Sequence, residues 1–120
     1  WIVNYHSEYF IELSEEAEVL QDAVFSLATV LQTRGPQLGR PYVDTLNGSL
    51  FPNMKELRIT LPDGEWRVAF AFDPKRKAVL LVGGSKSGVN ERKFYQKLIR
   101  VADERFSKHL AEMKRKKGGK

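Results

Sequence analysis

The chain of 120 residues contains no cysteine, which excludes disulfide bonds, thiolate zinc sites and cysteine nucleophiles. Histidine is scarce as well, because the only two, His6 and His109, lie far apart in the sequence. The sequence offers no recognisable set of metal ligands, so we expect a protein that uses neither a metal nor another cofactor. It also lacks any apolar run approaching ~18 residues, and we therefore expect no membrane-spanning helix and a cytoplasmic protein.

Lysine and arginine are missing from the first 33 residues, which instead contain six acidic side chains. The rest of the chain is basic, and the net charge of +5 therefore hides two regions of opposite sign. An acidic surface is available to a protein partner, whereas a basic one suits the phosphates of nucleic acid. The charge pattern alone predicts two surfaces with different partners.

The most basic segment is 114–120, which holds five cations and no acid. We expect one domain over residues 1–113, followed by this segment as a disordered tail. The tail is either a solubilising end or a diffuse contact to RNA or the ribosome. In the second case the contacts would come from Lys114, Arg115, Lys116 and Lys117.

Two adjacent segments alternate between apolar and charged residues and predict a β-hairpin. Leu57 and Val68 belong to the two apolar sets, and Arg58 and Arg67 belong to the opposite sets. Side chains alternate along a strand, so both apolar sets are buried together only if the two arginines emerge on the same other face. Pro62 and the Asp and Gly after it suit a tight turn. The arginine face is then either an anion site or a solvated surface.

The remaining patterns predict a small α+β domain, in which helices pack on one face of a twisted antiparallel sheet. Arg58 and Arg67 would point from its other face, which we expect to be partly open. The expected elements are a strand at 1–5, one or two helices capped by Ser7 or Ser14, an irregular connection at 37–53, the hairpin, a doubly covered strand at 78–82 and a helix from about Asn90 to Met113.

Five short strings are distinctive in combination: RGPQLGRP at 34–41, DTLNGS at 44–49, NMKELR at 53–58, WRVAF at 66–70 and VLLVGGSK at 79–86. With them the chain resembles the HigB-like branch of the RelE/ParE toxin superfamily. The resemblance implies the compact α+β toxin fold and cleavage of messenger RNA in the ribosome without a metal. It also implies restraint by a HigA-like antitoxin with a helix-turn-helix domain, through which alone the protein would contact DNA.

The resemblance further implies where the site lies. Arg67 resembles the strand arginine that such toxins direct at the scissile phosphate, and Lys86 resembles the basic residue that follows the last strand. Lys55 and Arg58 fall on the family's strand motif and would assist. The planar fork of an arginine suits phosphate oxygens, so these residues would stabilise the charge that develops during cleavage.

Cleavage of RNA through its own 2′-hydroxyl also requires proton transfer, for which Glu56 and Tyr95 are the candidates. Glu56 shares a strand face with Arg58 and is either a proton acceptor or the salt-bridge partner of that arginine. Tyr95 donates a proton only if the last helix starts close to the site, and otherwise it is a packing residue. The sequence leaves both alternatives open.

Two other functions are compatible with the same fold, because a fold does not fix a function. One is a ParE-like inhibitor of DNA gyrase without nuclease activity. The cluster of cations argues against it, since a protein-directed inhibitor needs no phosphate-matched charge. The other is a non-catalytic RNA-binding domain, which would present aromatic side chains for base stacking. Trp66, Phe70 and Phe72 instead fall on the apolar face of the hairpin.

Overall fold

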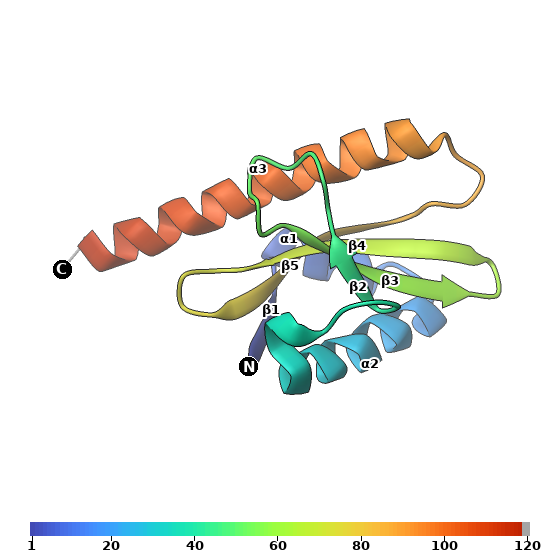
Figure 1. Cartoon of the computed structure of the whole chain (residues 1–120), viewed down its shortest axis with the longest axis horizontal. Helices are drawn as coiled ribbons and strands as arrows, with labels where there is room; N and C mark the ends of the chain where they lie inside the picture. The colour runs from blue at the N-terminus through green and yellow to red at the C-terminus, as the bar shows by residue number, and fades with distance from the viewer. Residues whose placement is uncertain (119–120) are drawn as a thin grey trace.

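A five-stranded sheet forms the centre of the computed structural model, which describes residues 1–118 (Figure 1). The strands lie in the order β1-β5-β4-β3-β2. The elements are β1 (Ile2–Tyr5), α1 (Ser7–Ser14), α2 (Glu18–Arg34), the short 3-10 helix η1 (Gly35–Gln37), β2 (Val43–Thr45), β3 (Lys55–Leu61), β4 (Gly64–Phe72), β5 (Lys77–Ser85) and α3 (Glu91–Gly118). The predicted α+β class is confirmed, as are the three consecutive antiparallel strands β3, β4 and β5.

The sheet is mixed, and the prediction of a purely antiparallel sheet was wrong in this respect. Strand β1 runs parallel to β5, with Tyr5 opposite Leu80. Alternation along a short strand carries no information about direction, and two helices and three strands separate β1 from β5 in the chain. The region 37–53, expected to be irregular, contains β2, which pairs with β3 at the opposite edge of the sheet.

Helices cover both faces of the sheet, although the sequence predicted helices on one face only (Figure 1). The α1 and α2 helices pack on the face that carries Leu57 and Val68. The α3 helix packs on the other face, against a second buried cluster that includes Ala69 and Leu81. Small and apolar residues on the supposedly open face provide enough surface to bury the apolar stripe of α3. The arginine face is consequently covered by a helix.

The predicted hairpin is confirmed, and the structure gives its register. Arg58 lies directly opposite Arg67, and Leu57 lies opposite Val68. The pairing closes at Leu61 and Gly64, so the turn contains only Pro62 and Asp63. Gly64 has a φ of 134°, in the region that glycine adopts at little cost. The two arginines therefore emerge side by side on one face, as alternation requires.

The first two helices begin at residues other than the expected serines. His6 caps α1, because its Nδ1 accepts a hydrogen bond from the backbone N–H of Glu8 at 3.2 Å. The α2 helix begins after Ala17, with no side-chain cap. Ser14 instead ends α1, and its hydroxyl donates to the carbonyl of Ile11 at 2.6 Å. Prediction of Ser7 or Ser14 as a helix cap was therefore wrong.

The α3 helix continues to Gly118, so the expectation of a disordered tail from residue 114 was wrong over 114–118. Residues 119–120 lie outside the described part of the chain. The run after Met113 consists of lysine and arginine, which are good helix formers, and no proline or glycine interrupts it before Gly118. The last turns project beyond the sheet (Figure 1). Across the described residues, no helix is long and apolar enough to span a membrane.

Candidate active site

A polar cleft of about 460 Å³ opens between the arginine face of the sheet and the first turns of α3. Its lining comes from Arg40 before β2, from β2 and the residues just after it, from β3, from the residue after β5 and from α3. These lining residues are Arg40, Asp44, Thr45, Leu46, Asn47, Glu56, Arg58, Lys86, Glu91 and Tyr95. The fold therefore brings four of the sequence-predicted site residues, Glu56, Arg58, Lys86 and Tyr95, to one cleft.

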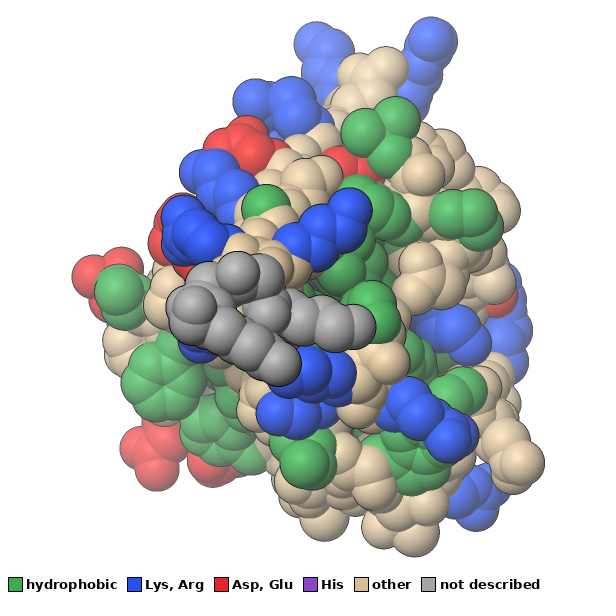
Figure 2. Space-filling view, turned by 90° about the vertical axis from the view of Figure 1, so that its left-hand side faces the viewer, with side chains coloured by type: hydrophobic (Ala, Val, Ile, Leu, Met, Phe, Trp, Pro, Cys, Tyr) green, Lys and Arg blue, Asp and Glu red, His purple; other side chains and the backbone are tan. Residues whose placement is uncertain are grey.

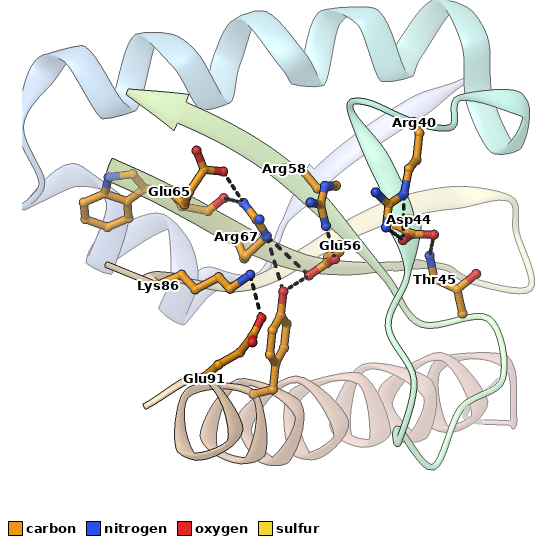
Figure 3. A network of polar contacts seen from close by, with 11 residues as sticks. Arg40, Asp44, Thr45, Glu56, Arg58, Glu65, Arg67, Lys86 and Glu91 are labelled. Carbon is orange, nitrogen blue, oxygen red and sulfur yellow. Dashed lines mark hydrogen bonds and ion pairs between the residues drawn. The ribbon is translucent and has the colours of Figure 1, made fainter. Parts of the chain in front are cut away.

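Glu56 lies at the centre of this cluster and is almost fully buried, with 5% of its side chain exposed. Its Oε2 accepts a hydrogen bond from Nη1 of Arg58 at 2.9 Å, and its Oε1 lies 3.7 Å from Nε of Arg67 (Figure 3). Two arginines directly opposite one another on a sheet would repel each other. The carboxylate of Glu56 offsets this repulsion by pairing with both.

Tyr95 links α3 to the same carboxylate. Its hydroxyl donates to Oε1 of Glu56 at 2.9 Å and accepts a hydrogen bond from Nε of Arg67 at 3.3 Å. Burial, followed by the hydrogen bond to Glu56, raises the pKa of the Tyr95 hydroxyl above its usual range. The hydroxyl is therefore protonated at neutral pH and acts as a donor. The α3 helix does begin close to the site, which was the condition for Tyr95 to serve as a proton donor.

Arg58 and Lys86 are the cations beside Glu56 and Tyr95 that a ligand in the cleft can reach, with 24% and 23% of their side chains exposed. Arg40 also lines the cleft and is 67% exposed, but its guanidinium is paired with Asp44. The Nζ of Lys86 lies 2.7 Å from Oε1 of Glu91 and 5.6 Å from the centre of the Tyr95 ring. Glu91 is 66% exposed, so this ion pair can open to admit an anion at little cost. Arg58 and Lys86 thus approach the same space from a strand and from the end of β5.

Arg67 is buried, whereas the sequence predicted that it faces an open surface. Only 2% of its side chain is exposed. Its guanidinium bonds to Tyr95, to the carbonyl of Trp66 at 3.0 Å and to Oε1 of Glu65 at 3.1 Å (Figure 3). Arg67 does not line the cleft. It forms the floor beneath Glu56 and Tyr95 and holds both in position.

Lys55 does not join the cluster. Alternation along β3 puts it on the same face as Leu57, toward α2 and away from Arg58. Its Nζ approaches the carbonyl of Pro36 in η1 at 3.5 Å. The family string contains both Lys55 and Arg58, but a strand separates residues of odd and even number onto opposite faces.

Of the cations after Met113, the described Lys114, Arg115 and Lys116 are far from the cleft. Tyr95 and Lys114 are separated by 19 positions of one continuous helix, which corresponds to about 28 Å along its axis. Figure 2 shows Lys and Arg side chains over α3 at this end of the molecule, with most of the acidic side chains in view toward one edge. The basic end of α3 is a surface separate from the cleft.

Several cleft residues were not identified as site residues from the sequence. Arg40 and Asp44 form an ion pair with 2.6 Å between Nη2 and Oδ2, and Asn47 and Glu91 also line the cleft. The first two belong to the strings RGPQLGRP and DTLNGS, which carried the family resemblance. Residues of these two strings form part of the wall of the cleft, although none of them had been predicted to be catalytic.

A larger groove of about 620 Å³ lies between the end of β5 and α3, but its lining does not suit acid–base chemistry. It consists mostly of apolar residues such as Val82, Phe94 and Leu98, with Lys93 and Lys97 as its charged members. Residues 1–118 also contain no group of three or more histidine and carboxylate side chains arranged to hold a metal ion. The smaller cleft is therefore the candidate active site.

Comparison with known proteins identifies the family. Residues 8–107 match the family described as phage derived protein Gp49-like (DUF891). Two proteins of Mycobacterium tuberculosis, named as the toxins HigB2 and HigB3, are each 44% identical to the chain, over 106 and 104 residues. The matches cover 81% and 86% of this chain. The chain spans about half the length of HigB2, 52%, and 85% of HigB3.

Among solved structures, the fold is similar to that of the E. coli RelE toxin. The crystal structure of isolated RelE superposes with a TM-score of 0.57 at 10% identity, over 81% of this chain and 96% of RelE. A double arginine-to-alanine mutant of RelE in the free state gives a TM-score of 0.57 at 8% identity, over 82% and 93%. This likeness concerns the fold alone. The family match and the identity to HigB2 and HigB3 show that the chain belongs to the Gp49-like family, as a HigB-like member with the RelE toxin fold.

Proposed function

We propose that the protein is the toxin of a toxin–antitoxin pair and cleaves messenger RNA on the ribosome. The observation that carries this proposal is the cleft in which Arg58, Lys86, Tyr95 and Glu56 converge. Two reachable cations suit a phosphodiester, and a bonded hydroxyl–carboxylate pair suits proton transfer. The names of HigB2 and HigB3 support the toxin assignment.

In the proposed reaction Arg58 and Lys86 bind the non-bridging oxygens of the phosphate and stabilise the charge on the pentacoordinate phosphorus. The carboxylate of Glu56 accepts the proton of the attacking 2′-hydroxyl, and the hydroxyl of Tyr95 donates a proton to the departing 5′-oxygen. The proton on Glu56 then passes to the Tyr95 oxygen along their hydrogen bond. The products are a 2′,3′-cyclic phosphate and a 5′-hydroxyl, and both side chains return to their starting states.

Glu56 is engaged by two arginines and a tyrosine in the free protein, so its carboxylate oxygens are already occupied when the substrate arrives. Such a site depends on precise alignment of the 2′-oxygen, and the ribosome supplies this alignment by holding the messenger strand. The proposed target places the activity in the cytoplasm. Gyrase inhibition is the less favoured function, because it gives no reason for a hydroxyl–carboxylate pair between two phosphate-matched cations.

The proposal is tested by mapping RNA ends on translating ribosomes with and without the protein. We expect new 5′-hydroxyl ends within translated codons, and their loss in a Tyr95→Phe variant of unchanged thermal stability. The chain shortened after Met113 should cleave at saturating ribosome concentration but bind with a weaker salt dependence, because the cations at the end of α3 act at a distance from the cleft. Intact messenger RNA together with relaxed DNA in a gyrase assay would support the gyrase alternative and reject this one.

The antitoxin, for which we propose a HigA-like helix-turn-helix protein, has a suitable docking surface on α1 and α2. Exposed apolar side chains, Phe10 at 53% and Ile11 at 60%, lie on α1, and the exposed acids Glu15 and Glu18 lie at the end of α1 and the start of α2. Glu12 is not available to a partner, because both of its carboxylate oxygens bind Arg105 of α3. An acidic surface is repelled by the phosphates of ribosomal RNA and is therefore free for a protein.

Reversing the charge of the two available acids tests this surface. The double variant Glu15→Lys with Glu18→Lys is expected to weaken antitoxin binding at least about tenfold, since it replaces two attractive charges by repulsive ones. RNA cleavage by the free toxin should persist. Glu112→Lys, at an exposed position on α3, is the matched control and should bind as the wild type does. Hydrogen-exchange protection that falls on Glu56–Arg67 instead of α1 and α2 would place the antitoxin over the cleft.

A further inference from the structure

A second groove, of about 460 Å³, lies on the far side of Tyr95 from the cleft. It is lined by Gly48, Arg92, Tyr95, Gln96, Ile99 and Arg100. Tyr95 borders both spaces, so the groove adjoins the candidate active site. None of its other residues takes part in the proposed chemistry.

The residues of this groove from α3 follow a regular pattern. Arg92, Gln96 and Arg100 are spaced four residues apart, so they lie on one side of the helix and span about 12 Å. All three side chains are exposed. Within the described residues, neither Arg92 nor Arg100 forms an ion pair with an acidic side chain. The stripe therefore presents two available cations with an amide between them.

The opposite wall of the groove is held in place by a buried carboxylate. Asp103 of α3 is only 7% exposed, and it accepts hydrogen bonds from the hydroxyl of Ser49 and, at 2.9 Å, from the backbone N–H of Leu50. These hydrogen bonds hold the β2–β3 loop against α3 and place Gly48 beside Ile99. A Cβ atom added to Gly48 would lie 3.6 Å from Cδ1 of Ile99. The groove is thus a built feature of the fold, with a fixed width.

We propose that this groove binds the nucleotide next to the cleaved phosphodiester and that Gln96 reads its base. This inference rests on the proposed RNA cleavage and names a specificity residue for it. Arg92 and Arg100 match the charge of the flanking phosphates, and Tyr95 with Ile99 provides an apolar surface for the base. The amide of Gln96 both donates and accepts, so it forms two hydrogen bonds with a base edge of matching pattern.

The alternative occupant of an exposed groove is a segment of a partner protein. The available cations at both ends of the stripe and the position next to a phosphate-matched cleft favour a single strand of RNA. A strand whose scissile phosphate lies between Arg58 and Lys86 passes Tyr95 in one direction or the other, and the groove receives the next nucleotide on that path.

The test is the distribution of bases around the cleavage sites in ribosome-bound messenger RNA. The wild-type protein is expected to show a base preference at one position next to the cut. Gln96→Ala should reduce that preference about tenfold, within the range of one bidentate contact, while preferences at other positions remain. Arg100→Ala should weaken cleavage uniformly over all sequences and reduce its salt dependence, as expected for a phosphate contact. Lys97 follows Gln96 in the sequence but lines the larger, mostly apolar groove instead. Lys97→Ala removes this charge and should change neither the base preference nor the salt dependence of cleavage.

The possible failures of this test can be told apart. If Gln96→Ala keeps the wild-type base preference, the assignment of Gln96 is wrong while RNA cleavage stands. If Arg100→Ala behaves as Lys97→Ala does, RNA does not pass through the groove. If the wild-type protein leaves messenger RNA intact, the proposed function fails and the subsite fails with it. Loss of antitoxin binding by Gln96→Ala, with the base preference unchanged, would assign the groove to a protein partner.

Discussion

Replacing Arg67 by methionine is expected to lower the free energy of unfolding by about 3 kcal/mol, near the lower end of the cost of removing one partner from a buried ion pair. The guanidinium is 2% exposed and pairs with Glu56, which is itself buried. Methionine keeps most of the volume but leaves the carboxylate with less compensation. The cost stays at the lower end because Glu56 keeps its bonds to Arg58 and Tyr95. Urea unfolding followed by tryptophan fluorescence measures the change.

A second variant separates the charge effect from a loss of packing. If the buried carboxylate is the cause, Arg67→Met combined with Glu56→Gln should be more stable than the sum of the two single changes predicts. Additive effects would show that Arg67 stabilises the fold by packing alone. A single variant as stable as the wild type would contradict the burial of this ion pair. The sequence had suggested that Arg67 points from a partly open face, and its burial in the structure shows that this prediction was wrong.

Arg58→Ala should have the largest effect on catalysis, with RNA cleavage on the ribosome reduced about 10²–10³-fold, as for the loss of one donor to a developing charge. Arg58 is the arginine of the cluster that a phosphate can reach, since 24% of its side chain is exposed in the cleft. Arg58→Lys should recover only part of the rate, because an ammonium cannot reproduce a bidentate contact. Single-turnover cleavage of a defined messenger on programmed ribosomes gives the rates.

The stability of the Arg58→Ala variant shows whether a slower rate results from the lost phosphate contact or from a damaged fold. Arg58→Ala should cost no more than about 1 kcal/mol, because the side chain is partly solvated and Glu56 keeps Arg67. Lys75→Ala, at an exposed cation in the β4–β5 turn, should leave both rate and stability unchanged. If Arg58→Ala cleaves at the wild-type rate, the phosphate does not bind in this cleft and the mechanism proposed for Glu56 and Tyr95 is wrong with it.

The site residues show how far the sequence pattern leads. Alternation along the hairpin predicted that Arg58 and Arg67 share a face, and the register confirms this. The same alternation separates Lys55 from them, yet the family string had grouped Lys55 with Arg58. Similarity of a string carries no information on the direction of a side chain, whereas the period of a strand does.

The sequence left the role of Tyr95 open and did not identify Glu91 as a site residue. Both belong to α3, and the face of the sheet on which α3 packs depends on the apolar surface that many residues bury together. Two faces were apolar enough to hold helices, because Ala69 and Leu81 complete the surface opposite α1 and α2. The pattern of the hairpin alone therefore predicted that its charged face is open to solvent.

The sequence by itself determined the α+β class, the hairpin and the family, because each depends on local periodicity, turn chemistry or strings of neighbouring residues. Only the tertiary structure decided that α3 covers the arginine face, that Arg67 lies under Tyr95 and Glu56, and that Arg58 and Lys86 are the accessible cations. The physical reason is that burial and charge pairing are sums over residues far apart in the chain. Arg58 and Arg67 have the same chemistry and lie on one face of the sheet, and only the position of the helix leaves one in the cleft and the other beneath it.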